Sequence, residues 1–452
     1  MSRPDADLLI AGGGLAAQRC CEALRRLGYD GRIVVLCEEQ SAPYDRPPLS
    51  KAILSGEREP EGLAFRAAAW YEEHDVELLL GVAAQELDIA GSAVRLRKSN
   101  ERGDGASRRG GSHRVDRLRF GELLIATGSR PRRLPGVALG GAVHELRTYD
   151  DALSLRAALR DRDGRLAILG GGLIGMEVAG AARALGRDVT ILEAATTPLE
   201  RLLPPALGRW IAYLHHLHGV DIRLGTTAER ASSRADGVRL ALSDTSTLDA
   251  GTVLVAAGTM PATEWLAGSG LGPGSLATDA GGRTECPGVY AAGDAASFPD
   301  PYLGERIPSQ HWEAAVRQGI AVARTIVGLP PAASVPSMCW SDQHGHRIQL
   351  VGHPSRDCEI ELDGDPAAGS FAAWITRAGR ARGVLLVDRP DSLPLARKWI
   401  ATGSTGGEDD GSDNHEHEEN EVPDDMHTGD RRVRVPRSRR LRGDRAGRIP
   451  RR

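Results

Sequence analysis

The fold is decided by the stretch DLLIAGGGLAAQRCCEALRRLG, residues 7–28. Its apolar run, residues 8–11, predicts a buried strand, and the helical periodicity after the glycines predicts a helix. Between the two, Gly12, Gly14 and Ala17 fit the pattern G-x-G-x-x-G/A. A strand, a glycine turn and a helix in this order are typical of a unit that binds a dinucleotide.

Each position of this fingerprint has a physical reason. Gly12 permits the tight turn, and Gly14 lets a pyrophosphate approach the backbone at the positive end of the helix. A second apolar stretch, RIVVLCEE, places Glu38 beyond the glycines at a distance of about 20 residues, where a carboxylate accepts a hydrogen bond from a ribose hydroxyl. We therefore predict a first dinucleotide site at the end of this strand.

The same order recurs in GRLAILGGGLIGMEVAGAARALGRDVTILEAA, residues 164–195. Glu193 ends its second strand, and a carboxylate there accepts from a ribose 2′-hydroxyl but repels a 2′-phosphate, which favours NADH over NADPH. Arg201 lies a few residues further on and leaves a contact with a phosphate open. The glycines of this second fingerprint are Gly170, Gly172 and Gly175.

Two further stretches indicate that one of the two dinucleotides is a flavin. LLIATGSRPRRLP, residues 123–135, is an apolar strand that ends in small residues around Thr127, where the chain can pass close to a cofactor. GVYAAGDAASF, residues 288–298, is a strand that ends in Gly293 and Asp294, and the small residues after them predict the start of a helix. Asp294 is expected to accept a hydrogen bond from a flavin ribitol hydroxyl, to cap that helix, or both.

Composition narrows the function further. The 57 basic and 61 acidic residues nearly balance, so nucleic acid is not expected as a partner. The six cysteines form neither C-x-x-C nor C-x4-C, which argues against a dithiol reductase and is typical of a reducing, cytoplasmic location. No apolar run reaches the roughly 18 residues that a membrane span needs, so no membrane partner is expected. The group YLHHLHG predicts a solvated helix end rather than a metal site.

With both fingerprints in place, the chain resembles the FAD-dependent pyridine-nucleotide reductases. PYDRPPLSK, residues 43–51, makes the resemblance narrower: it is similar to the ferredoxin reductases of oxygenase and cytochrome P450 systems, a group with putidaredoxin, rubredoxin and biphenyl-dioxygenase ferredoxin reductases. The resemblance covers about residues 5–403. Its other matches are ELRTYDDA (145–152), HWEAAVRQG (311–319), WSDQHGHRIQLVG (340–352) and VDRPDSLPLARKWIATG (387–403).

The resemblance implies an α/β fold of two Rossmann-like dinucleotide-binding domains, as in glutathione reductase, with a C-terminal α+β domain. We expect a split FAD-binding domain, with an NADH-binding domain inserted in it. A disordered, acidic and then arginine-rich tail is expected at the end. The expected bounds are 1–146 and 255–328 for the FAD domain, 147–254 for the NADH domain, 337–403 for the C-terminal domain and 404–452 for the tail.

The resemblance also implies a role for each matched position. Lys51 would lie near flavin N5 and pair with Glu177, as the catalytic pair, although a purely structural ion pair would look the same in the sequence. The prolines of the same motif restrict φ and so limit how Lys51 and Arg46, which is also expected to bind a cofactor, can be placed. The remaining cofactor contacts implied are Ala16 with the FAD pyrophosphate, Glu38 with the adenosine ribose, Ala84 with adenine, Arg147 with the FAD phosphates, Asp294 with ribitol, Trp312 with the isoalloxazine and Glu193 with the NADH ribose.

The implied activity is an NADH-dependent ferredoxin oxidoreductase. Hydride from NADH would reduce FAD, which would pass single electrons to a 2Fe-2S ferredoxin that serves an oxygenase or a P450. Two alternatives stay open: a flavoprotein that reduces rubredoxin, a quinone or oxygen, and a redox-sensing binding protein similar to apoptosis-inducing factors. A homodimer also stays open.

Overall fold

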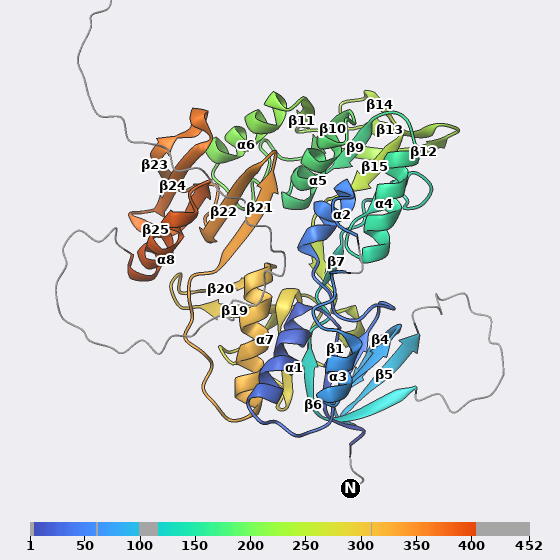
Figure 1. Ribbon diagram of the computed structural model, residues 1–452, viewed down its shortest axis with the longest axis vertical. Coiled ribbons are helices and arrows are strands. Elements are labelled where there is room, and N and C mark those ends of the chain that lie inside the picture. Colours follow the sequence, from blue (N-terminus) through green and yellow to red (C-terminus); the bar gives the residue numbers. More distant parts are fainter. Residues whose placement is uncertain (1–3, 60–61, 99–115, 309, 404–452) are drawn as a thin grey trace, which may run out of the picture. The chain divides into compact units, whose positions relative to one another are not determined.

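The computed structural model describes residues 4–59, 62–98, 116–308 and 310–403, which belong to one compact unit (Figure 1). The predicted disordered tail, 404–452, lies outside the described residues. The first fingerprint forms β1 (Ala6–Ala11) and α1 (Leu15–Arg26), and β2 (Ile33–Cys37) comes next, in the predicted order.

The first sheet has seven strands in the order β3-β2-β1-β6-β5-β4, with β18 paired to β6. Strands β3, β2, β1, β6 and β18 run parallel, so their carboxyl ends meet at one edge, where ligands bind in such sheets. The further strands of this sheet are β3 (Val76–Leu80), β4 (Val82–Asp88), β5 (Ala93–Lys98), β6 (Arg117–Ile125) and β18 (Val289–Ala291).

Helix α1 packs closely against α7 (Trp312–Ile326), which comes from the far end of this half of the chain (Figure 1). Gly319 makes this possible, because a Cβ there would lie 2.3 Å from the Ala16 carbonyl oxygen. The segment after residue 288 is thereby fixed beside the first fingerprint, although almost three hundred residues separate the two in sequence.

The second sheet has five parallel strands in the order β11-β10-β9-β15-β8. Its fingerprint lies between β9 and α5 (Leu173–Ala184). Strand β8 pairs with β15 here, so it belongs to the second sheet, whereas the predicted boundary at residue 146 left it with the FAD domain. The strands are β8 (Val143–Glu145), β9 (Leu166–Leu169), β10 (Val189–Glu193), β11 (Val220–Leu224) and β15 (Thr252–Val255).

The third large sheet is antiparallel, in the order β21-β22-β25-β24-β23, and is followed by α8 (Leu393–Thr402). Its buried face shares one hydrophobic core with the second sheet: Phe371 and Leu385 belong to the same cluster as Ile168 and Met176. Strand β21 is thus held against α5. The strands are β21 (Met338–Gln343), β22 (His346–Gly352), β23 (Glu359–Asp365), β24 (Ser370–Arg377) and β25 (Arg380–Val387).

One predicted element is wrong. The helix expected after Asp294 is only a 3-10 turn, Gly293–Ala295, followed by strand β19, and the next α-helix is α7. Small residues favour helix only weakly, and here the chain continues into a strand that pairs with β17 and β20. The remaining elements are α2 (Ala52–Ser55), α3 (Ala68–Glu73), β7 (Ser129–Pro131), α4 (Tyr149–Asp161), α6 (Pro205–Leu217), β12 (Ala228–Arg234), β13 (Gly237–Leu242), β14 (Thr247–Ala250), β16 (Thr259–Pro261), β17 (Leu276–Ala277), β19 (Ala296–Asp300) and β20 (Glu305–Pro308).

Candidate active site

Both fingerprints begin with a glycine that no other residue could replace without a collision. Gly12 has φ +113°, and a Cβ there would lie 2.2 Å from the Ala126 carbonyl oxygen. Gly170 has φ +119°, and its Cβ would lie 2.4 Å from the Ala256 carbonyl oxygen. In each unit the chain therefore turns directly against the end of the neighbouring strand.

The second glycine of each fingerprint opens toward space instead. Gly14 and Gly172 are the N-caps of α1 and α5, and a Cβ on either would meet no heavy atom within 4 Å. The first backbone N–H groups of both helices face this open side, where a pyrophosphate fits. Ala16 is buried in the first turn of α1, and Gly175 packs against the Gly170 carbonyl oxygen.

The two carboxylates after the second strands differ in their surroundings. Glu193 is held in place, since its carboxylate accepts from the N–H of Gly171 at 2.6 Å and from the N–H of Ala195 at 2.7 Å. Glu38 is 67% exposed and forms an ion pair with Arg97 at 3.0 Å. Both lie where a ribose contact was predicted, and Glu193 is the one whose position is set by the backbone.

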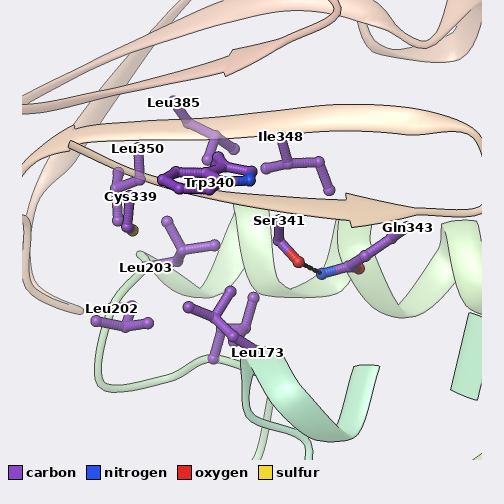
Figure 2. Close-up of a pocket in the computed structure, with 11 residues that line it drawn as sticks. Leu173, Leu202, Leu203, Cys339, Trp340, Ser341, Gln343, Ile348, Leu350 and Leu385 are labelled. Carbon is purple, nitrogen blue, oxygen red and sulfur yellow. Dashed lines mark hydrogen bonds between the residues drawn. The ribbon is translucent and has the colours of Figure 1, made fainter. Parts of the chain in front are cut away.

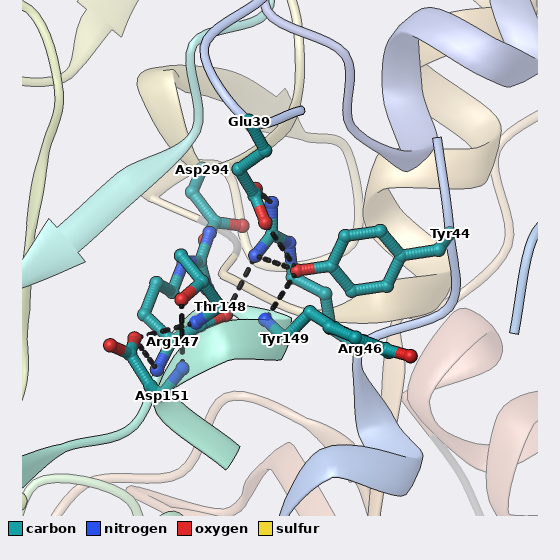
Figure 3. Close-up of polar contacts among 8 residues, drawn as sticks. All are labelled: Glu39, Tyr44, Arg46, Arg147, Thr148, Tyr149, Asp151 and Asp294. Atoms are coloured by element: carbon teal, nitrogen blue, oxygen red, sulfur yellow. Dashed lines mark hydrogen bonds and ion pairs between the residues drawn. The ribbon is translucent and has the colours of Figure 1, made fainter. Parts of the chain in front are cut away.

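A cluster of charges, which we call the arginine cluster, gathers near the carboxyl edge of the first sheet (Figure 3). Arg46 forms an ion pair with Glu39 at 2.6 Å and donates to the Arg147 carbonyl oxygen at 2.6 Å. Arg147 in turn pairs with Asp294 at 3.2 Å. Burial lowers the pKa of the Arg147 guanidinium, the Asp294 carboxylate opposes this, and the nearby Arg46 cation lowers it further. An added anion such as a phosphate would be favourable between two such cations.

Tyr44 ties this cluster to the next domain. Its hydroxyl donates to Glu39 at 2.6 Å and accepts from the N–H of Tyr149 at 2.9 Å, at the start of α4 (Figure 3). Thr148 caps the same helix through a capping box with Asp151. Sequence reasoning missed Glu39 and Tyr44 as members of the site, although Tyr44 stands inside the quoted PYDRPPLSK motif.

Asp294 lies where a ligand-facing carboxylate was predicted, but it does not cap a helix. It accepts a hydrogen bond from the Ser129 hydroxyl at 2.6 Å besides its pairing with Arg147. Nearby, the backbone N–H of Gly293 donates to Gln318 on α7 at 2.8 Å. The Thr127 hydroxyl is buried and has no hydrogen-bond partner within the described part of the chain, so it is available to a bound group.

Lys51 and Glu177 form an ion pair at 2.7 Å, between the PYDRPPLSK segment and α5. The Glu177 side chain is 4% exposed and that of Lys51 22%. Two hydroxyls also donate to the Glu177 carboxylate, Ser50 at 2.5 Å and Ser341 of β21 at 2.7 Å. Three parts of the chain thus meet at one buried carboxylate.

Trp312 begins α7 and donates its indole N–H to Asp45 at 2.8 Å. Burial raises the pKa of the Asp45 carboxyl, and this hydrogen bond lowers it. Trp312 also meets Trp340 edge to face, with ring centroids 5.8 Å apart. Trp340 lines an apolar pocket with Leu173 and Leu203, next to the fingerprint of the second sheet (Figure 2).

The other predicted contacts lie at the margins of this site. Ala84 is half-buried in β4, and Arg201 is exposed in the turn before α6, so the structure gives Arg201 no fixed position near a cofactor. All six cysteines are free. Burial raises the pKa of the Cys21 and Cys339 thiols to about 12, so neither is a reactive thiolate at neutral pH.

Comparison with known protein families identifies the class to which this chain belongs. Residues 6–319 match the family described as pyridine nucleotide-disulphide oxidoreductase, and residues 338–417 match the reductase C-terminal family. The fold, the site and these matches thus place the chain in a class of oxidoreductases that have two dinucleotide-binding units.

Individual relatives narrow this class. The chain is 34% identical over 399 residues, 88% of this chain and 94% of the relative, to the anthranilate 1,2-dioxygenase system ferredoxin–NAD(+) reductase component of Burkholderia cepacia. It is 36% identical over 395 residues, 86% of this chain and 91% of the relative, to the benzene 1,2-dioxygenase system ferredoxin–NAD(+) reductase subunit of Pseudomonas putida.

A solved structure, the covalent putidaredoxin reductase–putidaredoxin complex, superposes with a TM-score of 0.80 at 28% identity, over 89% of this chain and 94% of that chain. The chain therefore belongs to the pyridine nucleotide-disulphide oxidoreductase family, within the group that holds these ferredoxin–NAD(+) reductases. The resemblance seen in the sequence and the predicted fold class are confirmed. No helix in the described ranges is long and apolar enough to cross a membrane.

Proposed function

We propose that this chain is an NADH-dependent ferredoxin reductase that uses FAD and serves an oxygenase system. The relatives that span nearly all of its described length carry this activity in their names, and the partner in the superposed complex is putidaredoxin. The observation that carries the proposal is the Lys51–Glu177 pair, because it joins the first dinucleotide unit to the second.

The residues present fit both cofactors. For FAD, the open backbone at Gly14, the unpartnered Thr127 hydroxyl and the two guanidiniums of the arginine cluster supply a cradle, an unused hydrogen-bonding group and a positive charge. For NADH, Gly172 and the fixed Glu193 carboxylate supply the same kinds of contact. The site contacts and the division into FAD, NADH and C-terminal domains remain proposals, which this fit supports.

Lys51 is the residue to which we assign a direct effect on hydride transfer. When bound, FAD accepts a hydride from NADH and releases the electrons one at a time. The Lys51 ammonium is held by Glu177, and beside a bound flavin it would supply a positive charge that stabilises the negative charge developing during hydride transfer. Glu177 also keeps the ammonium from turning away, because its own position is set by the hydroxyls of Ser50 and Ser341.

A purely structural ion pair is the second interpretation of these two residues. Burying two charges in a core without a functional role is costly, and an apolar pair of similar size is often as stable. The Lys51 side chain is 22% exposed and that of Glu177 4%, so the pair is open on the lysine side, which favours the functional role.

The electron acceptor we propose is a 2Fe-2S ferredoxin. All six cysteines are free, and burial raises the pKa of the Cys20, Cys21 and Cys339 thiols, so the described chain offers no dithiol to take the electrons. Unpaired cysteines also support a cytoplasmic location as part of this proposal. Rubredoxin, quinone and oxygen are the acceptors against which ferredoxin is to be compared.

The test uses the purified full chain. It should be yellow, NADH should bleach it within the turnover time, and cytochrome c reduction should rise severalfold when a 2Fe-2S ferredoxin is added. NADPH serves as the matched control donor and a quinone as the control acceptor. A colourless protein would contradict the FAD proposal, and equal rates with and without ferredoxin would contradict the acceptor.

A further inference from the structure

Behind the Lys51–Glu177 pair, a line of hydrogen bonds runs away from the site. The Ser341 hydroxyl lies 2.7 Å from the Glu177 carboxylate. The Gln343 amide nitrogen lies 2.9 Å from the Ser341 hydroxyl (Figure 2). The Gln343 amide oxygen lies 3.0 Å from Nε2 of His215, and Nδ1 of His215 lies 3.0 Å from Nε2 of His344. We call Ser341, Gln343, His215 and His344 the relay.

Two helices, one strand and the turn after that strand contribute to this line. Glu177 stands on α5 and His215 on α6, whereas Ser341 and Gln343 stand on β21. His344 follows in the β21–β22 turn with φ +51°, a conformation that places its ring over α6. The prediction of a solvated helix end is therefore wrong for His215, which is fully buried, and holds for the exposed His216.

The ionised carboxylate fixes the direction of every bond. Glu177 only accepts, so the Ser341 hydroxyl must donate to it and can then only accept from Gln343. The Gln343 oxygen consequently faces His215, which must carry its proton on Nε2. His215 Nδ1 is then an acceptor, and His344 must donate from its own Nε2.

The histidines can hold these roles because both are neutral. Burial lowers the pKa of His215 to about 4, with the Gln343 hydrogen bond opposing and His218 adding to the effect. Burial, together with the neighbouring His215 and His218, lowers the pKa of His344 to about 3. At neutral pH each ring is therefore a single donor and a single acceptor.

We propose that the relay holds Glu177, and through it Lys51, in the position for hydride transfer, with His215 and His344 as positioning residues locked in their Nε2–H tautomers. This rests on the proposed function of Lys51. It also gives the C-terminal domain a role in the first half of the reaction, because Ser341, Gln343 and His344 all belong to that domain.

The direct test reads the tautomers and needs no turnover. Nitrogen-15 NMR of histidine-labelled holoprotein at pH 7 should show His215 and His344 as neutral Nε2–H tautomers, with assignment from single His→Gln variants. In Glu177→Gln the new amide can donate to Ser341, so the reverse direction becomes available. Both His215 tautomers should then be populated. Retention of a pure Nε2–H signal in that variant would overturn the relay, as would an Nδ1–H signal in the wild type.

The kinetic test measures flavin reduction by NADH in a stopped flow. Gln343→Glu keeps the shape but asks one Ser341 hydroxyl to serve two carboxylates, so reduction at saturating NADH should slow about 10-fold with an unchanged NADH Kd. His215→Phe should behave alike, whereas His215→Gln keeps a donor near Nε2 and should recover most of the rate. His216→Phe, on the exposed neighbour, is the matched control and should match the wild type.

The outcomes separate this inference from the proposed function. If the wild type is not reduced by NADH, the proposed function fails first. If the wild type is reduced and both Gln343→Glu and His215→Phe keep its rate, with FAD content equal by absorbance, the relay is wrong. An increase in the NADH Kd with an unchanged limiting rate would also contradict it, because that pattern belongs to nucleotide binding and not to the positioning of Lys51.

Discussion

The two dinucleotide units share one backbone and differ in what they place on it. Gly12 and Gly170 have almost the same φ and the same collision partner, a carbonyl oxygen at the end of the adjacent parallel strand. Arg19 follows Gly12 at the same interval as Glu177 follows Gly170. In the first unit that position holds Arg19, paired with Glu22 on its own helix, and in the second it holds a carboxylate paired with Lys51 across the domains.

The two positions differ in whether their side chains contact other parts of the chain. Arg19 makes a local, largely buried pair within α1 at 2.6 Å, which stabilises that helix. Glu177, on the same turn of its helix, is reached by a lysine of the first unit and a serine of the C-terminal sheet. The two units thus share the backbone motif, and in the second copy one side chain on it contacts both the first unit and the C-terminal sheet.

The largest effect should come from breaking the two turns separately. Gly12→Ala puts a Cβ into a backbone oxygen at φ +113° and should yield protein largely without FAD. Gly170→Ala should stay yellow but bind NADH roughly 100-fold more weakly, since a displacement of about 1 Å is costly at such a site. Absorbance and NADH titration measure the two losses.

Gly140→Ala is the matched control for these variants, because Gly140 has φ +115° with no atom within 4 Å of its Cβ position. It carries the backbone strain of about 1–3 kcal/mol without the collision. If Gly170→Ala also lost its FAD, the two units would not be independent cradles.

The next largest effect concerns the pair that joins the units. Lys51→Met should slow flavin reduction by NADH about 100-fold, because a fixed charge at the developing negative charge is removed. Stopped-flow absorbance measures it. Lys98→Met, at an exposed position of β5, is the control.

A double-mutant cycle sharpens this test. If Lys51 and Glu177 act as a unit, Lys51→Met with Glu177→Gln should be no slower than Lys51→Met alone. Additive losses would show that Glu177 acts separately from Lys51. A wild-type rate in Lys51→Met would leave the pair with a structural role only.

Much of this architecture could be predicted from the sequence. The strands and helices of both fingerprints lie within one or two residues of their predicted positions, because apolar runs, glycines and helical periodicity act over short distances. The partners Lys51 and Glu177 could be named in advance only through the resemblance, since a separation of 126 positions along the chain hides the contact from any local pattern.

The parts that the sequence could not give are those set by tertiary contacts. Glu39 and Tyr44 join the arginine cluster through Arg46 and Tyr149, and neither is marked by spacing. His215 was interpreted as part of a solvated helix end because the spacing of the three histidines suits a metal site poorly, whereas β21 covers its face of α6 and buries it. A burial that depends on a strand more than a hundred residues away leaves no local signal.

A smaller effect should follow from Glu193, the carboxylate that we propose as the ribose contact of the second unit. Glu193→Ala removes the repulsion of a 2′-phosphate and frees the N–H groups of Gly171 and Ala195. The ratio of kcat/KM for NADH to that for NADPH should fall about 10-fold. Glu229→Ala, exposed on β12, is the control. An unchanged ratio would show that Glu193 does not select between NADH and NADPH. The backbone contacts that fix Glu193 would then give it no role that the exposed Glu38 lacks.

The smallest effect is a pH dependence of the free energy of unfolding, which arises from His215 in the second unit. Because His215 titrates near its ordinary value of 6.5 when unfolded and near 4 when folded, the unfolded chain binds more protons between these values. Stability from this group is complete above pH 6.5 and is lost as the pH falls toward 4. Between pH 7 and 5.5 the loss should be about 1 kcal/mol for His215.

Urea unfolding of holoprotein at the two pH values measures this loss. His215→Gln should lose about 1 kcal/mol less than the wild type, and His216→Gln, which changes an exposed ring, should follow the wild type. The charges that face the buried pair are those of His218, His346 and Arg183, all of which disfavour a second proton there. Equal pH slopes in the wild type and His215→Gln would mean that His215 is protonated as easily in the folded protein as in the unfolded chain, and the second unit would then have no neutral pair behind its carboxylate.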